Sequence, residues 1–457
     1  MAEPVDSRAS IAGAVVLLVL GTAIWGVGLL SRAWFAGLFV FVGWYAFHSL
    51  YHRPGRRGLA QNGILLVASL GVCLVVAELT LRVWNRQTAR SAAFAHYFQS
   101  WPQRPNIYRF VPHVHATVDA YGDIANMSGA PAGAHTHPVE FQTDARGFRN
   151  QPGADQQPLD LVVLGDSYAA GLSVTQSKSW SRLLARNHDL AVYNMGVPGG
   201  PWNSYANWSF TGPELTVKPG AVMLLMLFEG NDLYDYYGPM DLTKLPRMTP
   251  WLRVHYRTSE FRRGAVIPDM LHRAIVGAGT ERTVLVRRSV DDEDVLYLGS
   301  YAERVLATRE QLAQAFNLGN MQQVISHLQA AADARDMRLV VVALPSKERV
   351  YLWHLTQQPA WSEPQGAQDS PFAGLVGDYC RERQIEVLDM TPVLRQAAEN
   401  HYTFSGGLLW WPEDTHWNEG GNAFIAEYLG RYLYGHSPAG PSPIPGLPDS
   451  PPEPAAP

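Results

Sequence analysis

The sequence has little cysteine and no excess of positive charge. Its 457 residues include two cysteines, Cys73 and Cys380, which lie far apart and belong to no cluster of metal ligands. A disulfide framework and a cysteine-based zinc site are therefore excluded. Acidic residues outnumber basic ones by 41 to 36, which gives a formal net charge of -5. Because a nucleic-acid-binding surface normally needs a basic excess, we expect no nucleic-acid partner.

Charged side chains are also missing from three stretches near the N-terminus. Residues 11–30 and 58–77 contain no Asp, Glu, Lys or Arg, and residues 33–51 contain only the titratable His48. Each stretch approaches the roughly 20 apolar residues that cross a bilayer, where only a helix satisfies its own backbone. We therefore predict a membrane anchor of about three transmembrane helices over residues 1–84. The alternative for the first stretch is a cleavable signal peptide, but no strong basic segment precedes it and a second hydrophobic stretch follows at once.

Basic residues between and after these stretches bear on the orientation. Residues 52–57 form a short basic connection that the positive-inside rule places in the cytoplasm. The third helix then runs outward, and the rest of the chain lies on the extracytoplasmic, periplasmic side of the cell membrane. Arg82, Arg86 and Arg90 follow the third helix on that outer side and weaken the argument, so the opposite orientation stays open.

Residues 85–157 are rich in His, Pro, Gly and aromatic side chains and show no sustained helical period. We expect an irregular, partly β lead-in segment there. Two pairs, His113/His115 and His135/His137, have the spacing that places both side chains on one face of a strand. A metal site is one interpretation of these pairs. A solvated or hydrogen-bonded strand face is the commoner one, and we predict neither a metal nor a cofactor.

From about residue 158, short apolar runs alternate with helical stretches. The expected strands are nearly continuous in apolar character, as parallel strands covered on both faces are: Leu161–Leu164, Ala191–Tyr193, Ala221–Phe228, Leu339–Leu344 and Glu386–Leu388. The expected helices are Ser179–Asn187, Arg309–Arg335 and Glu419–Tyr434. This alternation predicts a three-layer α/β/α domain with a parallel sheet over residues 158–435, with an insertion at about 233–308. The proline-rich residues 436–457 are expected to be a disordered tail.

The turns after the predicted strands hold the candidate functional residues, because ligands of open α/β sheets bind beyond the carboxyl ends of the strands. Gly165-Asp166-Ser167 follows the first strand, but such a turn is weak evidence by itself because these residues are common in turns. Further along the chain come a glycine-rich turn with Gly196, the turn 229–232, and the stretch 412–418 before the last helix.

Four short motifs in these turns, taken in order, resemble the sequence blocks of the SGNH (GDSL) hydrolase superfamily: Gly165-Asp166-Ser167, Gly196, Asn231 and Asp414-x-His416. Each stands at the strand end that the family uses, and the resemblance covers about residues 140–435. The run 144–150, with Gly147-Phe148-Arg149, is also similar to the lead-in of membrane-anchored members. The resemblance implies a flavodoxin-like SGNH sandwich that carries acyl-ester chemistry.

The residue types fit that chemistry. A serine hydroxyl becomes an effective nucleophile when a base takes its proton and a carboxylate orients the base. Ser167 is the expected nucleophile, His416 the base and Asp414 the orienting carboxylate. The backbone N–H groups of Ser167 and Gly196 and the side-chain amide of Asn231 are expected to stabilise the oxyanion.

Two positions depart from the commonest family pattern. The carboxylate usually stands three residues before the histidine, where this chain has Glu413, whereas Asp414 stands two before. The Asp-Thr-His-Trp form resembles polysaccharide O-acetylation proteins of the alginate type, so Asp414 is favoured and Glu413 is the alternative. In the third block, Glu229 occupies the usual glycine position and Gly230 is adjacent to Asn231, which leaves the shape of that loop open.

The leading hypothesis is a membrane-anchored, extracytoplasmic serine esterase or O-acyltransferase that acts on acyl esters, foremost acetyl esters, of carbohydrate or lipid. The resemblance implies a bilayer, a glycan or acyl-ester substrate and a membrane-embedded acyl-donor protein as partners. No residue in the four blocks decides whether water or a sugar hydroxyl takes the acyl group. The alternative is a non-catalytic glycan-binding or structural subunit of a membrane complex.

Overall fold

The structure is a computed structural model that describes residues 97–101, 104–120, 122–128, 136–234, 284–288, 293–315, 317–356 and 369–435. The three predicted transmembrane stretches and the proline-rich tail lie outside these residues. Among the described helices, none combines the length and the apolar character that a membrane crossing requires. The membrane anchor therefore stays a prediction from the sequence.

A five-stranded parallel sheet forms the centre of the described part, with the strand order β11-β10-β7-β5-β6. The strands are β5 (Leu159–Leu164), β6 (Val192–Asn194), β7 (Val217–Phe228), β10 (Arg338–Leu344) and β11 (Glu386–Asp389). Strand β6 follows β5 at one edge of the sheet, whereas β7, β10 and β11 lie in turn on the other side of β5. This is the flavodoxin-like order, in which the connections change direction between the first and third strands. The predicted parallel sheet is confirmed.

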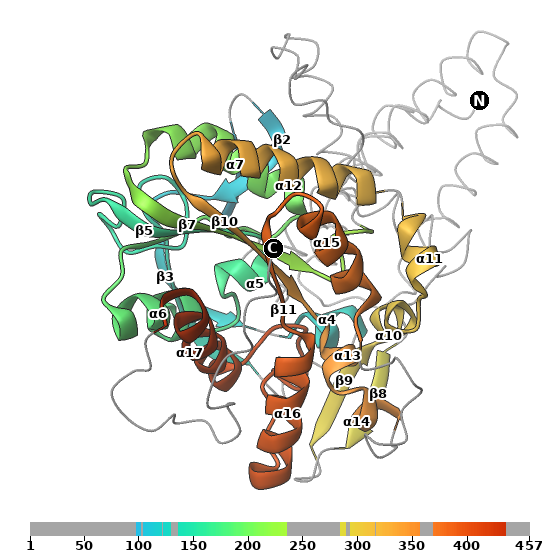
Figure 1. The fold of residues 1–457 in the computed structure, drawn as a ribbon. Coiled ribbons are helices and arrows are strands. Elements are labelled where there is room, and N and C mark those ends of the chain that lie inside the picture. Colours follow the sequence, from blue (N-terminus) through green and yellow to red (C-terminus); the bar gives the residue numbers. More distant parts are fainter. Residues whose placement is uncertain are drawn as a thin grey trace, which may run out of the picture. The chain divides into compact units, whose positions relative to one another are not determined.

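Helices cover both faces of this sheet (Figure 1). Successive residues of β5 alternate between two apolar clusters, with Val162 and Leu164 in one and Leu161 and Val163 in the other. The first cluster includes residues of α7 (Pro201–Thr211), α12 (Leu318–Asp333) and α15 (Pro371–Arg381). The second includes residues of α6 (Trp180–His188), α16 (Thr391–Ser405) and α17 (Glu419–Tyr434). The three predicted layers follow from this period of two along buried strands.

The single helix predicted over Arg309–Arg335 is wrong, because the structure divides it into α11 (Arg309–Ala313) and α12. Thr308 and Gln311 form a capping box at the start of α11, and the chain turns before α12 begins. The two helices pack against different partners, α11 against α15 and α12 against α7 and β10. Tertiary packing thus outweighs a helical propensity that runs through both segments.

Before the sheet, the chain forms two antiparallel strand pairs, and a short helix lies in the sequence between the two strands of the second pair. These are β1 (Phe98–Trp101) with β2 (Arg104–Phe110), β3 (His115–Ala120) with β4 (His137–Gln142), and α4 (Asp123–Ser128). The Asn203 side chain on α7 accepts from the backbone N–H of Tyr108 at 2.8 Å and donates to its carbonyl at 3.0 Å. Strand β2 is therefore fastened to the helical layer of the sheet domain.

The described histidines of the two predicted pairs do not gather. In the β3–β4 register, His115 pairs with Gln142 and His137 with Ala120, so they lie at opposite ends of the hairpin. The His137 ring stacks on Trp411 with centroids 3.9 Å apart. His135 lies outside the described residues.

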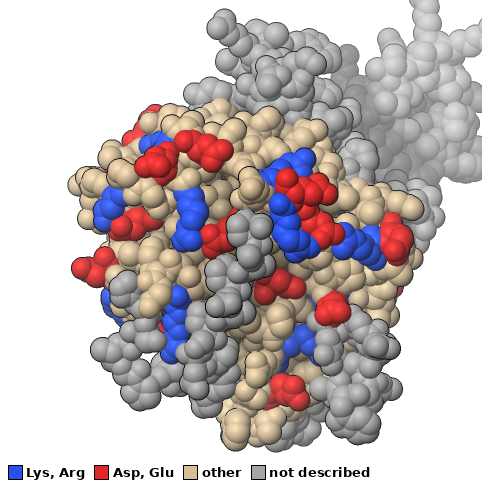
Figure 2. Space-filling view, in the orientation of Figure 1, with Lys and Arg blue, Asp and Glu red and all other residues tan. Residues whose placement is uncertain are grey.

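Part of the predicted insertion forms a hairpin of β8 (Val284–Arg288) and β9 (Asp294–Leu298), followed by α10 (Gly299–Val305). The Leu296 N–H donates to the Pro412 carbonyl at 2.8 Å, which joins β9 to the loop before α17. The remaining short elements are α5 (Ser167–Ala170), η3 (Gln176–Lys178), η4 (Gly212–Glu214), α13 (Lys347–Val350) and α14 (Leu352–Thr356). On the face drawn in Figure 2, acidic and basic side chains of the described residues are interspersed, without a broad area of one sign.

Candidate active site

The turn after β5 places Ser167 at the carboxyl edge of the sheet. Gly165 has φ 148°, and a Cβ at that position would lie 2.7 Å from Cβ of Ala169, so a side chain there would clash. The Asp166 carboxylate caps α5 by accepting from the backbone N–H of Tyr168 at 2.9 Å. Ser167 is therefore the first residue of a helix that starts beyond a strand with neighbours on both sides.

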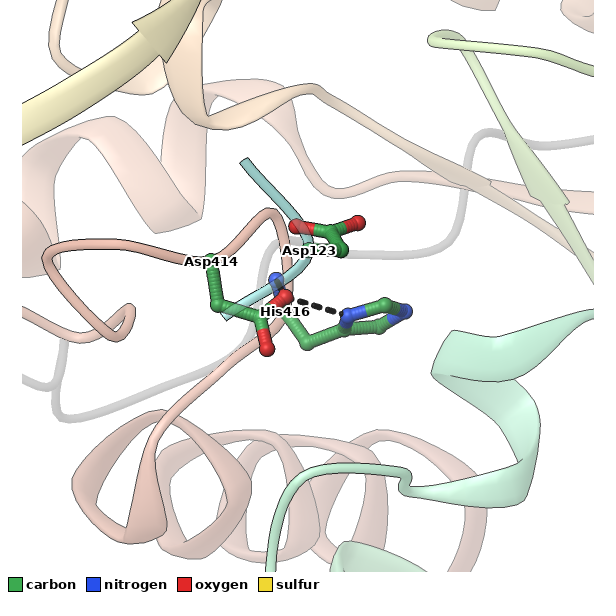
Figure 3. A group of neighbouring side chains, drawn as sticks. All are labelled: Asp123, Asp414 and His416. Carbon is green, nitrogen blue, oxygen red and sulfur yellow. Dashed lines mark hydrogen bonds and ion pairs between the residues drawn. The ribbon is translucent and has the colours of Figure 1, made fainter. Parts of the chain in front are cut away.

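The structure brings Ser167, His416 and Asp414 into one hydrogen-bonded chain. The Ser167 hydroxyl lies 2.7 Å from His416 Nε2, and His416 Nδ1 lies 2.7 Å from Asp414 Oδ1. Figure 3 shows the Asp414–His416 contact. With Nδ1 donating to the carboxylate, Nε2 is left to accept the serine proton, as a general base must.

The two-residue spacing of Asp414 and His416 has a physical basis. Asp414 Oδ1 accepts from the backbone N–H of His416 at 3.0 Å as well as from its ring. A short acidic side chain readily accepts from the N–H two residues on, so one oxygen fixes both the backbone and the imidazole. Glu413 is buried, and neither of its carboxyl oxygens has a hydrogen-bond partner among the described residues. Asp414, and not Glu413, is therefore the carboxylate at His416.

Ser173 supports Asp414 from the other side. Its hydroxyl donates to Asp414 Oδ2 at 2.9 Å, and its backbone has φ 67°, which is uncommon for a residue with a side chain. The indole N–H of Trp411 and Nε2 of His137 both donate to the Ser173 carbonyl, at 3.0 and 2.7 Å. These contacts hold the strained residue in the position where it reaches the carboxylate.

Lys347 fixes the backbone of residues 411–416, which we call the histidine loop. Its ammonium group is buried and donates to the carbonyls of Leu296 (3.0 Å), Trp411 (2.8 Å), Pro412 (2.8 Å) and Asp414 (3.3 Å). Burial lowers the pKa of Lys347 to about 8, although nearby carboxylates oppose that shift. A buried cation with four carbonyl acceptors can satisfy several backbone groups of an irregular loop at once.

Tyr168 connects the serine turn to the same loop. Its hydroxyl donates to the Thr415 carbonyl and accepts from the indole N–H of Trp410 at 3.2 Å. Its ring packs against His416 with centroids 5.2 Å apart. Burial raises the pKa of Tyr168 well above its usual value, so it acts here as a neutral donor. The turn of Ser167 and the loop of His416 are thus held together through adjacent residues.

The predicted oxyanion donors lie at the ends of three neighbouring strands: Ser167 after β5, Gly196 after β6 and Asn231 after β7. The Gly196 N–H donates to Asn194 Oδ1 at 2.8 Å, so an oxyanion would have to share that hydrogen. The side-chain oxygen of Asn231 is buried without a partner among the described residues. The oxyanion role of these groups stays a prediction. Asn194, which sequence reasoning did not select, also donates to the Ala169 carbonyl at 2.7 Å and so braces α5.

Glu229, the departure in the third block, pairs with Arg349. Nε of Arg349 lies 2.6 and 2.8 Å from the two Glu229 carboxylate oxygens, and both side chains are almost fully buried. The next residue must be small, because a Cβ at Gly230 would lie 2.3 Å from the ring of Phe228. The Glu229–Arg349 pair therefore holds the turn that carries Asn231, and the unusual order Glu-Gly-Asn has a structural cause.

We expect Arg349→Met to destabilise the protein by about 3–5 kcal/mol, because Glu229 would be left as an unpaired buried charge. The midpoint of denaturant unfolding of the full chain, followed by tryptophan fluorescence, measures this. Arg309→Met is the matched control, because Arg309 pairs with Asp378 at an exposed position where a loss below about 1 kcal/mol is expected. Equal losses in the two variants would contradict the role of the buried pair.

The Gly147-Phe148-Arg149 run braces the segment that follows Ser167. The Arg149 guanidinium is buried and donates to the carbonyls of Ala170, Gly171 and Val174. Burial lowers the pKa of Arg149 to about 9. Phe148 belongs to the apolar cluster on one face of the sheet. The lead-in segment thus contributes to the geometry of the serine turn.

Asp123, at the start of α4, is a site residue that sequence reasoning missed. Its oxygens accept from the backbone N–H and the hydroxyl of Thr415, at 2.8 and 2.5 Å. One oxygen each of Asp123 and Asp414 and one ring nitrogen of His416 lie within 4.8 Å of one another (Figure 3). Asp123 stands 292 residues before Thr415 in the sequence, so no local motif links the two.

The charges of this group shift one another. Burial alone would raise the pKa of Asp414, but His416 and its hydrogen bonds outweigh burial and lower it. Burial alone would lower the pKa of His416, but Asp414 outweighs burial and raises it. Burial, and then the neighbouring Asp414, raise the pKa of Asp123 to about 7. Asp414 and His416 therefore stabilise each other's charged forms, the state reached when His416 takes a proton.

Asp123, Asp414 and His416 also have the composition of a metal-ligand set. Both ring nitrogens of His416 are already engaged, Nδ1 with Asp414 and Nε2 with Ser167. A metal ion would have to displace one of these 2.7 Å contacts. The hydrogen-bonding pattern therefore favours a nucleophile and base over a metal centre.

Comparison with known families is consistent with this arrangement. Residues 301–441 match the model of a family described as the SGNH hydrolase-like domain of the acetyltransferase AlgX. The matched range includes Asp414 and His416 and covers less than half of the chain. The resemblance to the SGNH superfamily and its alginate-type O-acetylation proteins is confirmed. A search of curated protein sequences found no match.

Solved structures of similar proteins are distant. A G-D-S-L family protein from Desulfitobacterium hafniense shares 14% identity at a TM-score of 0.29, covering 59% of this chain and 97% of its own. A member of the lipolytic G-D-S-L family from Veillonella parvula shares 10% identity at a TM-score of 0.29, covering 60% and 96%. The crystal structure of TesA shares 13% identity at a TM-score of 0.29, covering 60% of this chain and 96% of its own. Likenesses this distant add nothing to the assignment of the site.

Proposed function

We propose that this chain is an SGNH-type serine enzyme, an esterase or O-acyltransferase, that carries an acyl group on Ser167. The observation that carries the proposal is the continuous chain from Ser167 through His416 to Asp414, with both contacts at 2.7 Å. The matched family description supports the same class, since it names an SGNH hydrolase-like domain and an acetyltransferase. A vestigial site would have no need to keep both contacts aligned.

In the proposed reaction, Oγ of Ser167 attacks the carbonyl carbon of an ester while His416 Nε2 takes the hydroxyl proton. Asp414 stabilises the resulting imidazolium, and donors at the strand ends stabilise the oxyanion. The tetrahedral intermediate then expels the alcohol, which receives the proton from His416, and the acyl-enzyme remains. In the second half, His416 takes a proton from water or from an acceptor hydroxyl, which attacks the acyl-enzyme and frees Ser167.

The finer parts of the proposal rest on the sequence and the family description. Acetyl is the favoured acyl group because the matched family is described by an acetyltransferase. The uncharged stretches before residue 84 support a membrane anchor, and the basic residues 52–57 support a catalytic domain on the extracytoplasmic side. A carbohydrate or lipid ester as substrate and a membrane-embedded acyl-donor protein as partner belong to the same proposal.

Labelling and acyl transfer together test this function. We expect the full chain to react with a fluorophosphonate at Ser167 and to release p-nitrophenol from p-nitrophenyl acetate. With an oligosaccharide present, mass spectrometry of the products separates the two outcomes of the second half-reaction. Acetylated sugar identifies a transferase, and acetate alone identifies an esterase. If the chain binds glycan but is neither labelled nor able to hydrolyse an ester, the enzyme proposal is contradicted and a non-catalytic glycan-binding subunit is favoured.

A further inference from the structure

Asp123 reaches the catalytic residues from a segment outside the sheet domain. It is the first residue of α4, and Ile124 beside it is fully buried in a cluster with Leu296 and Leu298 of β9. The backbone N–H of Ala125 donates to the Glu413 carbonyl at 3.1 Å. Helix α4 is therefore joined to the histidine loop by backbone and side-chain hydrogen bonds and to β9 by apolar contacts, which together define where the Asp123 carboxyl lies.

Both oxygens of Asp123 accept hydrogen bonds from Thr415. They accept from the backbone N–H and the hydroxyl of Thr415, the residue between Asp414 and His416. A neutral side chain such as Asn could also bond to both groups of Thr415. A carboxyl group this close to Asp414 adds like-charge repulsion that Asn would avoid, so the charge itself requires an explanation.

A charge at Asp123 is explained by His416, which gains a positive charge during the proposed reaction. Burial lowers the pKa of His416, and three carboxylates raise it: Asp414 through its charge and a hydrogen bond, and Asp123 and Asp166 through their charges. Two further titratable groups belong to or contact the histidine loop: buried Glu413 and Lys347, which donates to the Trp411 and Pro412 carbonyls. Uncharged Tyr168 covers one side of the ring.

We propose that Asp123 is a positioning residue of the catalytic triad, which fixes Thr415 and, in its ionised form, adds a second negative charge that stabilises the imidazolium of His416. The inference rests on the proposed function in that it assigns His416 as the base. It also makes the lead-in segment part of the catalytic unit, since residues 158–435 alone would lack this carboxyl. No bond to the substrate is assigned to Asp123.

Asp123→Asn tests the charge while it keeps groups that can bond to Thr415. Asp119→Asn is the matched control, because it removes the same charge from an exposed position on β3. We expect Asp123→Asn to lower the pKa of His416, measured by NMR titration of an imidazole signal assigned with His416→Gln. The acidic limb of kcat/KM with p-nitrophenyl acetate should move to lower pH, and kcat should fall on the order of tenfold. Asp119→Asn should leave all three unchanged.

The outcomes separate the inference from the proposed function. The titration needs no turnover, so a lower His416 pKa in Asp123→Asn supports the positioning role even if the wild type hydrolyses no ester. An unchanged His416 pKa and pH profile, with only a lower unfolding temperature, would overturn it and leave Asp123 a structural residue. Loss of Zn²⁺ binding in Asp123→Asn, together with Zn²⁺-dependent activity in the wild type, would overturn it in favour of a metal site.

Discussion

Ser167→Ala should lower kcat for p-nitrophenyl acetate by on the order of 10⁴- to 10⁶-fold and abolish fluorophosphonate labelling. The variant removes the one oxygen that His416 Nε2 contacts at 2.7 Å, so no acyl-enzyme can form. The residual rate would come from the predicted oxyanion donors and from binding alone. The measurement is initial-rate hydrolysis by the full chain, with labelling detected by mass spectrometry of the peptide that contains residue 167.

The matched control for this result is Ser209→Ala. Ser209 lies exposed on α7, where its hydroxyl donates only to the Tyr205 carbonyl of the same helix at 2.9 Å. Its rate and labelling should equal those of the wild type. Activity above about a tenth of wild type in Ser167→Ala, or labelling at another serine, would show that a different nucleophile carries the reaction and would remove the basis of the proposed function.

Asp414→Asn should lower kcat about 10⁴-fold, whereas Glu413→Gln should change it less than about threefold. An asparagine keeps the size of Asp414 but neither fixes the ring tautomer nor stabilises the imidazolium. The Glu413 carboxyl is buried without a hydrogen-bond partner among the described residues, and burial raises its pKa to about 7, so glutamine resembles the protonated form that this carboxyl takes below about pH 7. Parallel kinetics of the two variants compare adjacent acidic residues in one loop.

A pH series strengthens the comparison of these two variants. Asp414 raises the pKa of His416, so its replacement should lower that pKa and move any remaining acidic limb to lower pH. Glu413→Gln should leave the limb in place. The reverse pattern, with activity lost in Glu413→Gln and kept in Asp414→Asn, would identify Glu413 as the orienting group and contradict the geometry of the loop.

The sheet could be predicted because its signal is local. Five short apolar runs became five parallel strands with bounds shifted by a few residues, since strands buried on both faces must be apolar along their length. The helix over Arg309–Arg335 could not be divided correctly from the sequence. Its break depends on α11 packing against α15 while α12 packs against α7, and no local pattern encodes those partners.

The candidate site divides in the same way. Ser167 and His416 stand in turns directly after or before predicted elements, and the resemblance to the SGNH blocks implied that they meet. Lys347, Arg349 and Asp123 gave no such signal, because an isolated charged residue in a sequence is usually solvent-exposed. Each became significant only through partners far along the chain, such as the Trp411 carbonyl for Lys347 and Glu229 for Arg349.

The sequence by itself determined the broad class of this chain. Its sparse charge predicts an anchor, its few cysteines exclude a disulfide framework, and its apolar runs predict an α/β domain whose turns carry a serine, an asparagine and a histidine. Those properties follow from composition and from periods of a few residues. Only the tertiary structure decided that Asp414 rather than Glu413 orients His416, and that Asp123 lies beside them. The physical reason is that the choice depends on side-chain direction and burial, which long-range packing sets.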